Sequence, residues 1–105
     1  MPSPLGEKIR TLREEKGLSL DKLAKLTDSS KGYLWELENR DSPNPSIDKI
    51  DRIARELGVT VEFLVSDTVS SPDQEVADQA FFRRYQDLKP ETKAKISKFL
   101  EMWEE

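Results

Sequence analysis

The stretch that decides the fold is Ser30-Lys31-Gly32-Tyr33-Leu34-Trp35-Glu36-Leu37-Glu38, which is predicted to be a short helix. Ser30 is a favourable N-cap, because its hydroxyl accepts a hydrogen bond from a backbone N–H of the first turn. Leu34 and Leu37 are three residues apart and therefore share one inward face. The opposite face carries Lys31, Gly32, Trp35 and Glu36. Since so short a helix is not stable alone, neighbouring helices must hold it with this polar and aromatic side outward.

Two helices are predicted before this stretch. Leu5, Ile9 and Leu12 form an amphipathic stripe in a helix from Leu5 to Lys16, and Gly17 provides a left-handed stop. Ser19 is the expected N-cap of a second helix. The inner face of that helix is Leu20, Leu23, Ala24 and Thr27. Asp28-Ser29 leaves a connection of about three residues, which is the length typical of a helix-turn-helix.

Two further helices are predicted after the loop of residues 39–45. Ser46 caps the fourth helix and Gly58 closes it, while Thr60 caps a short fifth helix. Apolar residues recur at helical spacing in both: Ile47, Ile50, Ile53, Ala54, Leu57, Val61 and Leu64. The predicted fold class is therefore all-α, with a five-helix domain in residues 1–65.

A linker at 66–71 and a helical hairpin at 72–105 complete the predicted organisation. Ser71 is the expected N-cap of a sixth helix that has Pro72 at its first position and ends near Asp87. Lys89-Pro90 starts the last helix. The two helices carry an apolar face that consists of Val76, Ala80, Phe81, Phe82, Tyr85 and Leu88 and then of Ile96, Phe99, Leu100 and Trp103.

The composition excludes several classes of function. The chain has no cysteine and no histidine, so zinc fingers, thiol nucleophiles, disulfides and histidine acid–base catalysis are ruled out. No glycine loop that could cradle phosphate and no cluster of metal ligands occurs. We therefore expect no catalytic residue, no metal, no cofactor and no enzymatic activity. No apolar run approaches ~18 residues and no signal sequence is evident, so a cytoplasmic protein without membrane contact is expected.

The charge distribution bears on the kind of partner. The net charge is −4, but residues 1–66 hold eleven Lys and Arg against twelve Asp and Glu, a net of −1. Residues 67–105 hold six Lys and Arg against nine Asp and Glu, a net of −3, so the acidic excess lies mainly in this C-terminal segment. This balance argues against tight non-specific binding of nucleic acid, and it leaves open a specific reader with one basic face.

The ordered set of motifs resembles the Xre or Cro/cI type of helix-turn-helix regulators from bacteria and phages. The matching text is Leu18-Ser19, Leu23-Ala24, Ser30-Lys31-Gly32-Tyr33-Leu34, Leu37-Glu38, Pro45-Ser46, Ile53-Ala54, Leu57-Gly58-Val59-Thr60 and Phe63-Leu64. It covers roughly residues 5–65. The resemblance implies a lambda-repressor-like DNA-binding domain in which the helix after Ser30 enters the major groove.

The resemblance also implies roles for individual residues. Lys31, Gly32, Trp35 and Glu36 would contact base edges, with Lys31 donating to guanine and Glu36 accepting from a cytosine amino group. Phosphate contacts would come from Ser29, Ser30, Asn39, Arg40 and Asn44. Arg13 and Glu38 occupy the positions of a partly buried ion pair. The sequence departs from the family at Leu20, where Gln is common, at Arg40, where Gly is common, and at the acidic Glu36.

Other roles remain open for these side chains. Trp35 would also fit a surface covered by a neighbouring subunit, or the core. Lys31 and Glu36 would also fit a solvated helix surface. The last two helices would either fold back on the five-helix domain or pair with a second copy.

We favour a homodimer, because the hairpin has more large aromatic side chains than it can bury alone. The predicted dimer contacts are Phe81, Phe82, Tyr85, Ile96, Phe99, Leu100 and Trp103. The predicted function is a dimeric repressor that reads a pseudo-palindromic operator in double-stranded DNA. The alternative is an antitoxin-type interaction module, which binds a toxin or protease partner protein and regulates its own operon.

Overall fold

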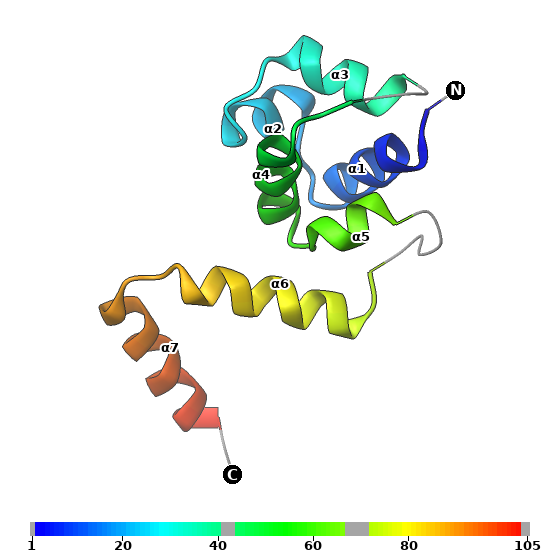
Figure 1. Cartoon of the computed structure of the whole chain (residues 1–105). Coiled ribbons are helices and arrows are strands. Elements are labelled where there is room, and N and C mark those ends of the chain that lie inside the picture. Colours follow the sequence, from blue (N-terminus) through cyan, green and yellow to red (C-terminus); the bar gives the residue numbers. More distant parts are fainter. Residues whose placement is uncertain (1, 41–43, 67–71, 104–105) are drawn as a thin grey trace.

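The computed structural model describes residues 2–40, 44–66 and 72–103, and within these ranges every regular element is an α-helix. The helices are α1 (Pro4–Glu15), α2 (Leu20–Leu26), α3 (Lys31–Asn39), α4 (Ile47–Leu57), α5 (Val61–Val65), α6 (Gln74–Gln86) and α7 (Pro90–Trp103). Helices α1 to α5 form one bundle, α6 runs along one side of it, and α7 projects away (Figure 1). The predicted all-α class is confirmed.

Four predicted N-caps are present in the bundle. The side-chain oxygens of Ser19, Ser30, Ser46 and Thr60 each accept a hydrogen bond from the backbone N–H three residues later, at 3.0 to 3.2 Å. Gly58 ends α4 with φ +70°, a left-handed conformation that glycine adopts without strain. These local signals account for most of the helix boundaries.

Two helix starts differ from the prediction. Helix α1 begins one residue early, because Ser3 accepts from the N–H of Gly6 at 3.0 Å and caps it. Helix α6 begins at Gln74, with Asp73 as the N-cap that accepts from Val76 N–H at 2.9 Å. The prediction of Ser71 as this cap was wrong. The Asp73 carboxylate lies closer to the helix, is a strong cap, and interacts favourably with the positive end of the helix dipole. Ser71 and linker residues 67–71 lie outside the described residues.

The core comes from the first five helices and the α4–α5 connection. Its buried members are Ile9, Leu12, Leu23, Ala24, Leu34, Leu37, Ile50, Ile53, Ala54, Leu57, Val59, Phe63 and Leu64. Thr27, predicted on the inner face of α2, is also fully buried. Ile47 continues the apolar spacing of α4 yet is 76% exposed, since α4 meets the core only from Ile50 onward.

Helix α1 crosses the end of α3 at very short range. A Cβ at Gly6 would lie 2.6 Å from the carbonyl oxygen of Leu37 and 2.7 Å from that of Glu38. No side chain fits there without a shift of the backbone, so glycine is required by the packing of α1 on α3. The sequence pattern did not predict this contact, because it joins residues about 30 positions apart.

Lys8 of α1 is a buried cation that fastens the end of α5. Its Nζ donates to the carbonyl oxygen of Phe63 at 2.7 Å and also to that of Ser66. The same Nζ lies 4.5 Å from the centre of the Phe63 ring. Carbonyls at a helix C-terminus carry partial negative charge, so a lysine is well placed here.

Helices α6 and α7 bury little of their surface. No described residue of either helix is buried, and Val76 is the apolar side chain of α6 that packs against the core. Among the described helices, none combines the length and the apolar character needed to cross a membrane. Most of the large apolar side chains of α6 and α7 are exposed to solvent in the isolated chain.

Candidate nucleic-acid interface

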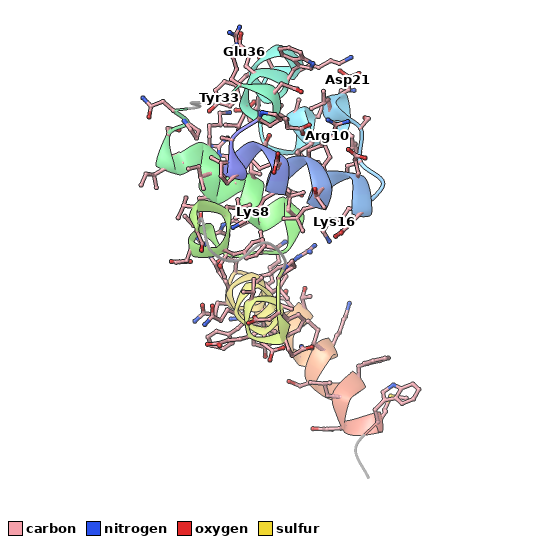
Figure 2. The ribbon with its side chains drawn as sticks, turned by 90° about the vertical axis from the view of Figure 1, so that its right-hand side faces the viewer. Lys8, Arg10, Lys16, Asp21, Tyr33 and Glu36 are labelled. Atoms are coloured by element: carbon pink, nitrogen blue, oxygen red, sulfur yellow. The ribbon has the colours of Figure 1, made fainter. Side chains whose placement is uncertain are left out.

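Helix α3 turns one face to the core and the other to solvent. Leu34 and Leu37 are buried, whereas Lys31 and Glu36 are exposed and Trp35 is 51% exposed. Glu36 lies at the end of the molecule opposite α7 (Figure 2). The polar and aromatic side of α3 is therefore available to a ligand.

Gly32 lies on this outward face for no reason of internal packing. A Cβ at this position would meet no heavy atom within 4 Å. Gly32 is the second residue of α3, where glycine still costs part of the roughly 1 kcal/mol that it costs relative to alanine in a helix interior, and no contact within the described chain explains that cost. A bare backbone at this point leaves room for close approach of another surface.

The charged residues of this face lie in two exposed ion pairs. Lys31 Nζ is 3.6 Å from Asp21 Oδ2 in the first turn of α2, and Arg40 Nη2 is 3.3 Å from Glu36 Oε1. Exposed pairs of this kind contribute little to stability, so either cation can leave its partner for a better one. The sequence indicated Asp21 only as a favourable charge at a helix start, and not as a partner of Lys31.

The two serines that precede α3 already make hydrogen bonds within the chain. The Ser30 hydroxyl accepts from Tyr33 N–H as the N-cap. Ser29 is half-buried, and its hydroxyl accepts from Thr27 Oγ1 at 3.1 Å. The Ser29 N–H donates to the carbonyl of Ala24 at 2.8 Å. Of the two, Ser30 is therefore the more exposed.

The remaining predicted phosphate contacts differ in how exposed their side chains are. Asn39 is half-buried, and its side-chain amide donates to the carbonyl of Trp35 at 2.8 Å. Arg40 and Asn44 are exposed. Arg40 ends α3 in an extended conformation, with φ −85° and ψ 149°, so no left-handed glycine is needed at this position.

Helix α4 holds the turn between α2 and α3. Asp28 has a positive φ of 54°, a conformation that Asp tolerates better than most residues. Lys49 Nζ donates to the carbonyl of Thr27 at 3.2 Å and also to that of Asp28. Arg52 Nη1 lies 3.5 Å from the Asp28 carboxylate. Sequence reasoning did not find these two cations, because no local pattern connects α4 to this turn.

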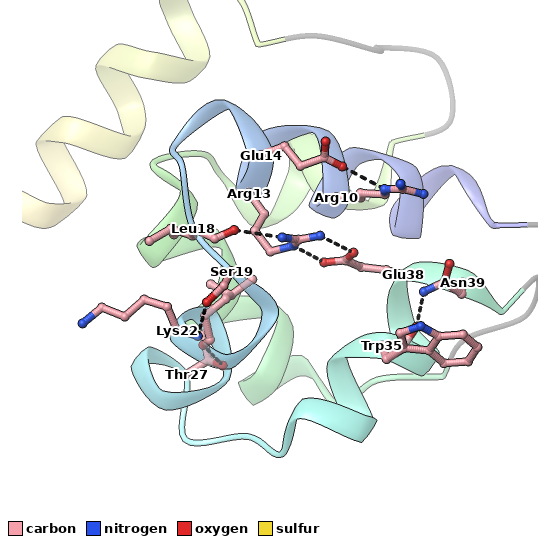
Figure 3. A network of polar contacts seen from close by, with 11 residues as sticks. Arg10, Arg13, Glu14, Leu18, Ser19, Lys22, Thr27, Trp35, Glu38 and Asn39 are labelled. Atoms are coloured by element: carbon pink, nitrogen blue, oxygen red, sulfur yellow. Dashed lines mark hydrogen bonds and ion pairs between the residues drawn. The ribbon is translucent and has the colours of Figure 1, made fainter.

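An ion pair ties α3 to α1 (Figure 3). Arg13 Nε and Nη2 donate to the two carboxylate oxygens of Glu38 at 2.7 and 3.1 Å, and Nη1 donates to the carbonyl of Leu18 at 2.8 Å. The Glu38 side chain is 2% exposed and that of Arg13 is 13% exposed. The hydrogen bonds to Glu38 raise the pKa of Arg13, and elsewhere on α3 burial raises the pKa of the Tyr33 hydroxyl. The bidentate geometry fixes the end of α3 on α1.

The predicted dimer contacts lie on the surface of the two C-terminal helices. Phe81, Phe82, Phe99, Leu100 and Trp103 are exposed, while Tyr85 and Ile96 are half-buried. The rings of Phe81 and Tyr85 stack on α6, and those of Phe99 and Trp103 meet on α7. These side chains do not fold back to enlarge the core of the bundle.

Several known proteins resemble this chain in sequence or in structure. The regulator SinR of Bacillus licheniformis is 35% identical over 63 residues, or 60% of this chain. The chain covers 57% of the length of that relative. A crystal structure of SinR, the master regulator for biofilm formation, in complex with DNA matches 59% of this chain and 98% of that chain, with 35% identity and a TM-score of 0.56.

The fold of the C-terminal helices also has a counterpart. A complex of the SinR and SinI proteins matches 93% of this chain and 95% of that chain, with a TM-score of 0.59 and 24% identity. At that identity the likeness concerns the fold alone. The sequence model of the helix-turn-helix family matches residues 9–64, which is more than half of the chain. The protein therefore belongs to the helix-turn-helix family of the Xre or Cro/cI type.

Proposed function

We propose that this protein is a sequence-specific DNA-binding transcriptional regulator that reads its site with α3. The observation that carries the proposal is the outward face of α3, which is held by buried leucines and by the Arg13–Glu38 pair. A rigid helix with exposed side chains suits insertion into a major groove. The crystallised relative in complex with DNA, at 35% identity, supports the same use of the fold.

Side chains in the first two turns of α3 contact the bases. Lys31 donates to guanine O6 and N7, and Glu36 accepts from a cytosine amino group. Trp35 lies against a thymine methyl or a sugar, and Gly32 lets the helix backbone approach the groove. Arg40 and Asn44, both exposed, serve as phosphate contacts, with Ser30 at the start of the helix.

The functional unit is a homodimer formed through α6 and α7. Among the described residues of these helices, six large apolar side chains are exposed in the single chain, and a second copy would cover them: Phe81, Phe82, Phe99, Leu100, Met102 and Trp103. A two-fold dimer presents two copies of α3 to half-sites about one helical turn, ~34 Å, apart. Occupancy of such an operator blocks polymerase, so we propose repression by occlusion.

Selection of bound sites from a random DNA pool tests this proposal. Wild type is expected to enrich a symmetric motif with two half-sites at one spacing. Lys98→Ala, which removes an exposed lysine of α7, should enrich the same motif, whereas Lys31→Ala should enrich a motif with one position relaxed. Failure of wild type to enrich any motif across a range of salt concentrations would refute the proposal; the range is needed because non-specific binding is strongest at low salt and masks specific binding there.

The exposed apolar side chains of α6 and α7 also favour a second candidate function. They would fit the surface of a different protein, as in an antitoxin that covers its partner and regulates its own operon. Gel filtration of the chain from its native cell extract separates the two. A homodimer alone supports the plain regulator, and a stoichiometric partner that co-elutes through a second column supports the interaction module.

A further inference from the structure

Helix α6 is attached to the bundle at two separate points. Near its start, Val76 packs against the edge of the core. Near its end, Arg83 and Asp87 form ion pairs with Asp51 and Arg55 of α4. The attachments are seven to eleven residues apart, or about 10–16 Å along the helix. Two such points define the direction of the helix axis, which a single point would leave free.

The second attachment is a network of four charges, which we call the α4–α6 clamp: Asp51, Arg55, Arg83 and Asp87. The Asp51 carboxylate accepts from Arg83 and from Arg55 Nε, the latter at 3.2 Å. Arg55 Nη1 also donates to Asp87, and this hydrogen bond raises the pKa of Arg55. Asp51 is half-buried between the two helices. Linked charges with shared partners hold geometry better than isolated surface pairs do.

Apolar packing contributes little between the two attachments. A groove of about 410 Å³ lies between the end of α4 and α6, with Gly58, Val59, Ala77 and Ala80 among its lining residues. No described residue of α6 is buried. The direction of α6 therefore depends on the α4–α6 clamp more than on the core.

We infer that the α4–α6 clamp is a positioning element, which fixes the C-terminal helices relative to α3 and thereby sets the spacing between the two half-sites of the operator. The inference rests on the proposed function, because spacing matters only for a dimer on DNA. The 13 residues of α6 span about 20 Å, and a rotation of about 20° over that length moves its end by about 7 Å. That displacement is close to two base pairs at about 3.4 Å each.

The Asp51→Asn variant tests the clamp, because it removes the charge shared by both arginines and keeps the shape of the side chain. The matched control is Glu14→Gln, which changes the net charge equally and neutralises an exposed pair with Arg10 on α1. A fourfold swap, D51R/R55D/R83D/D87R, restores every pair with opposite polarity. Binding is measured to duplexes with two selected half-sites whose separation varies from −2 to +2 base pairs around an optimum (about one helical turn), and to a single half-site.

Wild type, the control and the fourfold swap are expected to bind the duplex of optimal spacing about tenfold or more tightly than duplexes of the other spacings. Asp51→Asn is expected to lose most of this preference while its affinity for the single half-site stays unchanged. An unaltered preference in Asp51→Asn would overturn the inference. Equal loss on the single half-site would also overturn it, since the residue would then act on folding or on DNA contact.

A second measurement separates the clamp from the proposed function. The chain has no cysteine, so Lys25→Cys on α2 and Gln79→Cys on α6 provide unique sites for spin labels in chains diluted with unlabelled protein. The label-to-label distance distribution should be narrow in wild type and in Glu14→Gln, and broad in Asp51→Asn. A distribution that Asp51→Asn leaves unchanged refutes the clamp. If the distance distribution of Asp51→Asn broadens but wild type selects no DNA site, the clamp holds α6 in place, and both its role in half-site spacing and the proposed function are refuted.

Discussion

Replacement of Arg13 by methionine is the sharpest test of how α3 is held. The change removes both hydrogen bonds to Glu38, at 2.7 and 3.1 Å, and leaves a carboxylate that is 2% exposed without its cation. Loss of one partner from a buried pair costs about 3–5 kcal/mol. Small domains are stable by about 5–10 kcal/mol, so we expect the variant to lose roughly half of its free energy of unfolding.

The opposite replacement, Glu38→Leu, should cost less. Arg13 is 13% exposed and keeps its hydrogen bond to the carbonyl of Leu18 at 2.8 Å, so its charge reaches water more easily. We expect Glu38→Leu to lower the free energy of unfolding by about 2 kcal/mol. The double variant R13M/E38L should be within about 1 kcal/mol of wild-type stability, because it leaves no buried charge unpaired.

Urea unfolding followed by circular dichroism at 222 nm measures these differences. The matched control is Arg10→Met, which removes an exposed pair of similar length, 2.8 Å to Glu14, from the same helix. It should change stability by less than about 0.5 kcal/mol. The reasoning fails if Arg13→Met and Arg10→Met cost the same, or if the double variant costs the sum of the single ones.

Four other substitutions are expected to have distinct effects. Gly6→Ala should destabilise by about 1–3 kcal/mol in urea unfolding, because its Cβ would lie 2.6 Å from the Leu37 carbonyl oxygen; wild-type stability would contradict the close packing. Gly32→Ala should stabilise the fold by about 0.5–1 kcal/mol and yet weaken operator binding in a gel-shift assay; stronger binding would remove Gly32 from the interface. Lys31→Ala should weaken specific binding by about 1–3 kcal/mol and leave random DNA unaffected, whereas equal loss on both would indicate a phosphate contact only. Leu100→Glu should yield monomers in sedimentation equilibrium at concentrations where wild type and the surface control Ser97→Glu are dimers; an intact dimer would place the interface elsewhere.

Local chemistry in the sequence was enough to predict most of the bundle. A hydroxyl at the N-cap and a glycine at the C-terminus act on the next few backbone groups, so Ser19, Ser30, Ser46, Thr60 and Gly58 could be recognised without a structure. The helical spacing of apolar residues likewise indicated the core. It failed at Ile47, because the period gives the face of a helix and not the point at which that helix meets its neighbours.

Contacts between distant segments were beyond the sequence pattern. The close approach at Gly6, the burial of Lys8 and the support of the α2–α3 turn by Lys49 and Arg52 all join residues 20 or more positions apart. Arg13 and Glu38, which lie 2.7 Å apart, were indicated by the family resemblance and not by any spacing rule. For the outward face of α3, the sequence predicted which residues are exposed, but it gave no sign that Asp21 lies beside Lys31.

The pairing of charges on the α3 face bears on how an acidic protein would bind DNA. Lys31 and Arg40 each already lie beside a carboxylate, so contact with a base or a phosphate of DNA replaces an existing partner. The gain from displaced counterions per cation is then smaller than for an unpaired lysine, and binding by one copy should be weak and only moderately dependent on salt. Useful affinity would have to come from base contacts and from a second copy that raises the effective concentration of α3 at the other half-site. The exposed apolar residues of α6 and α7, and a clamp that holds them at a fixed direction, are the features that such a mechanism requires.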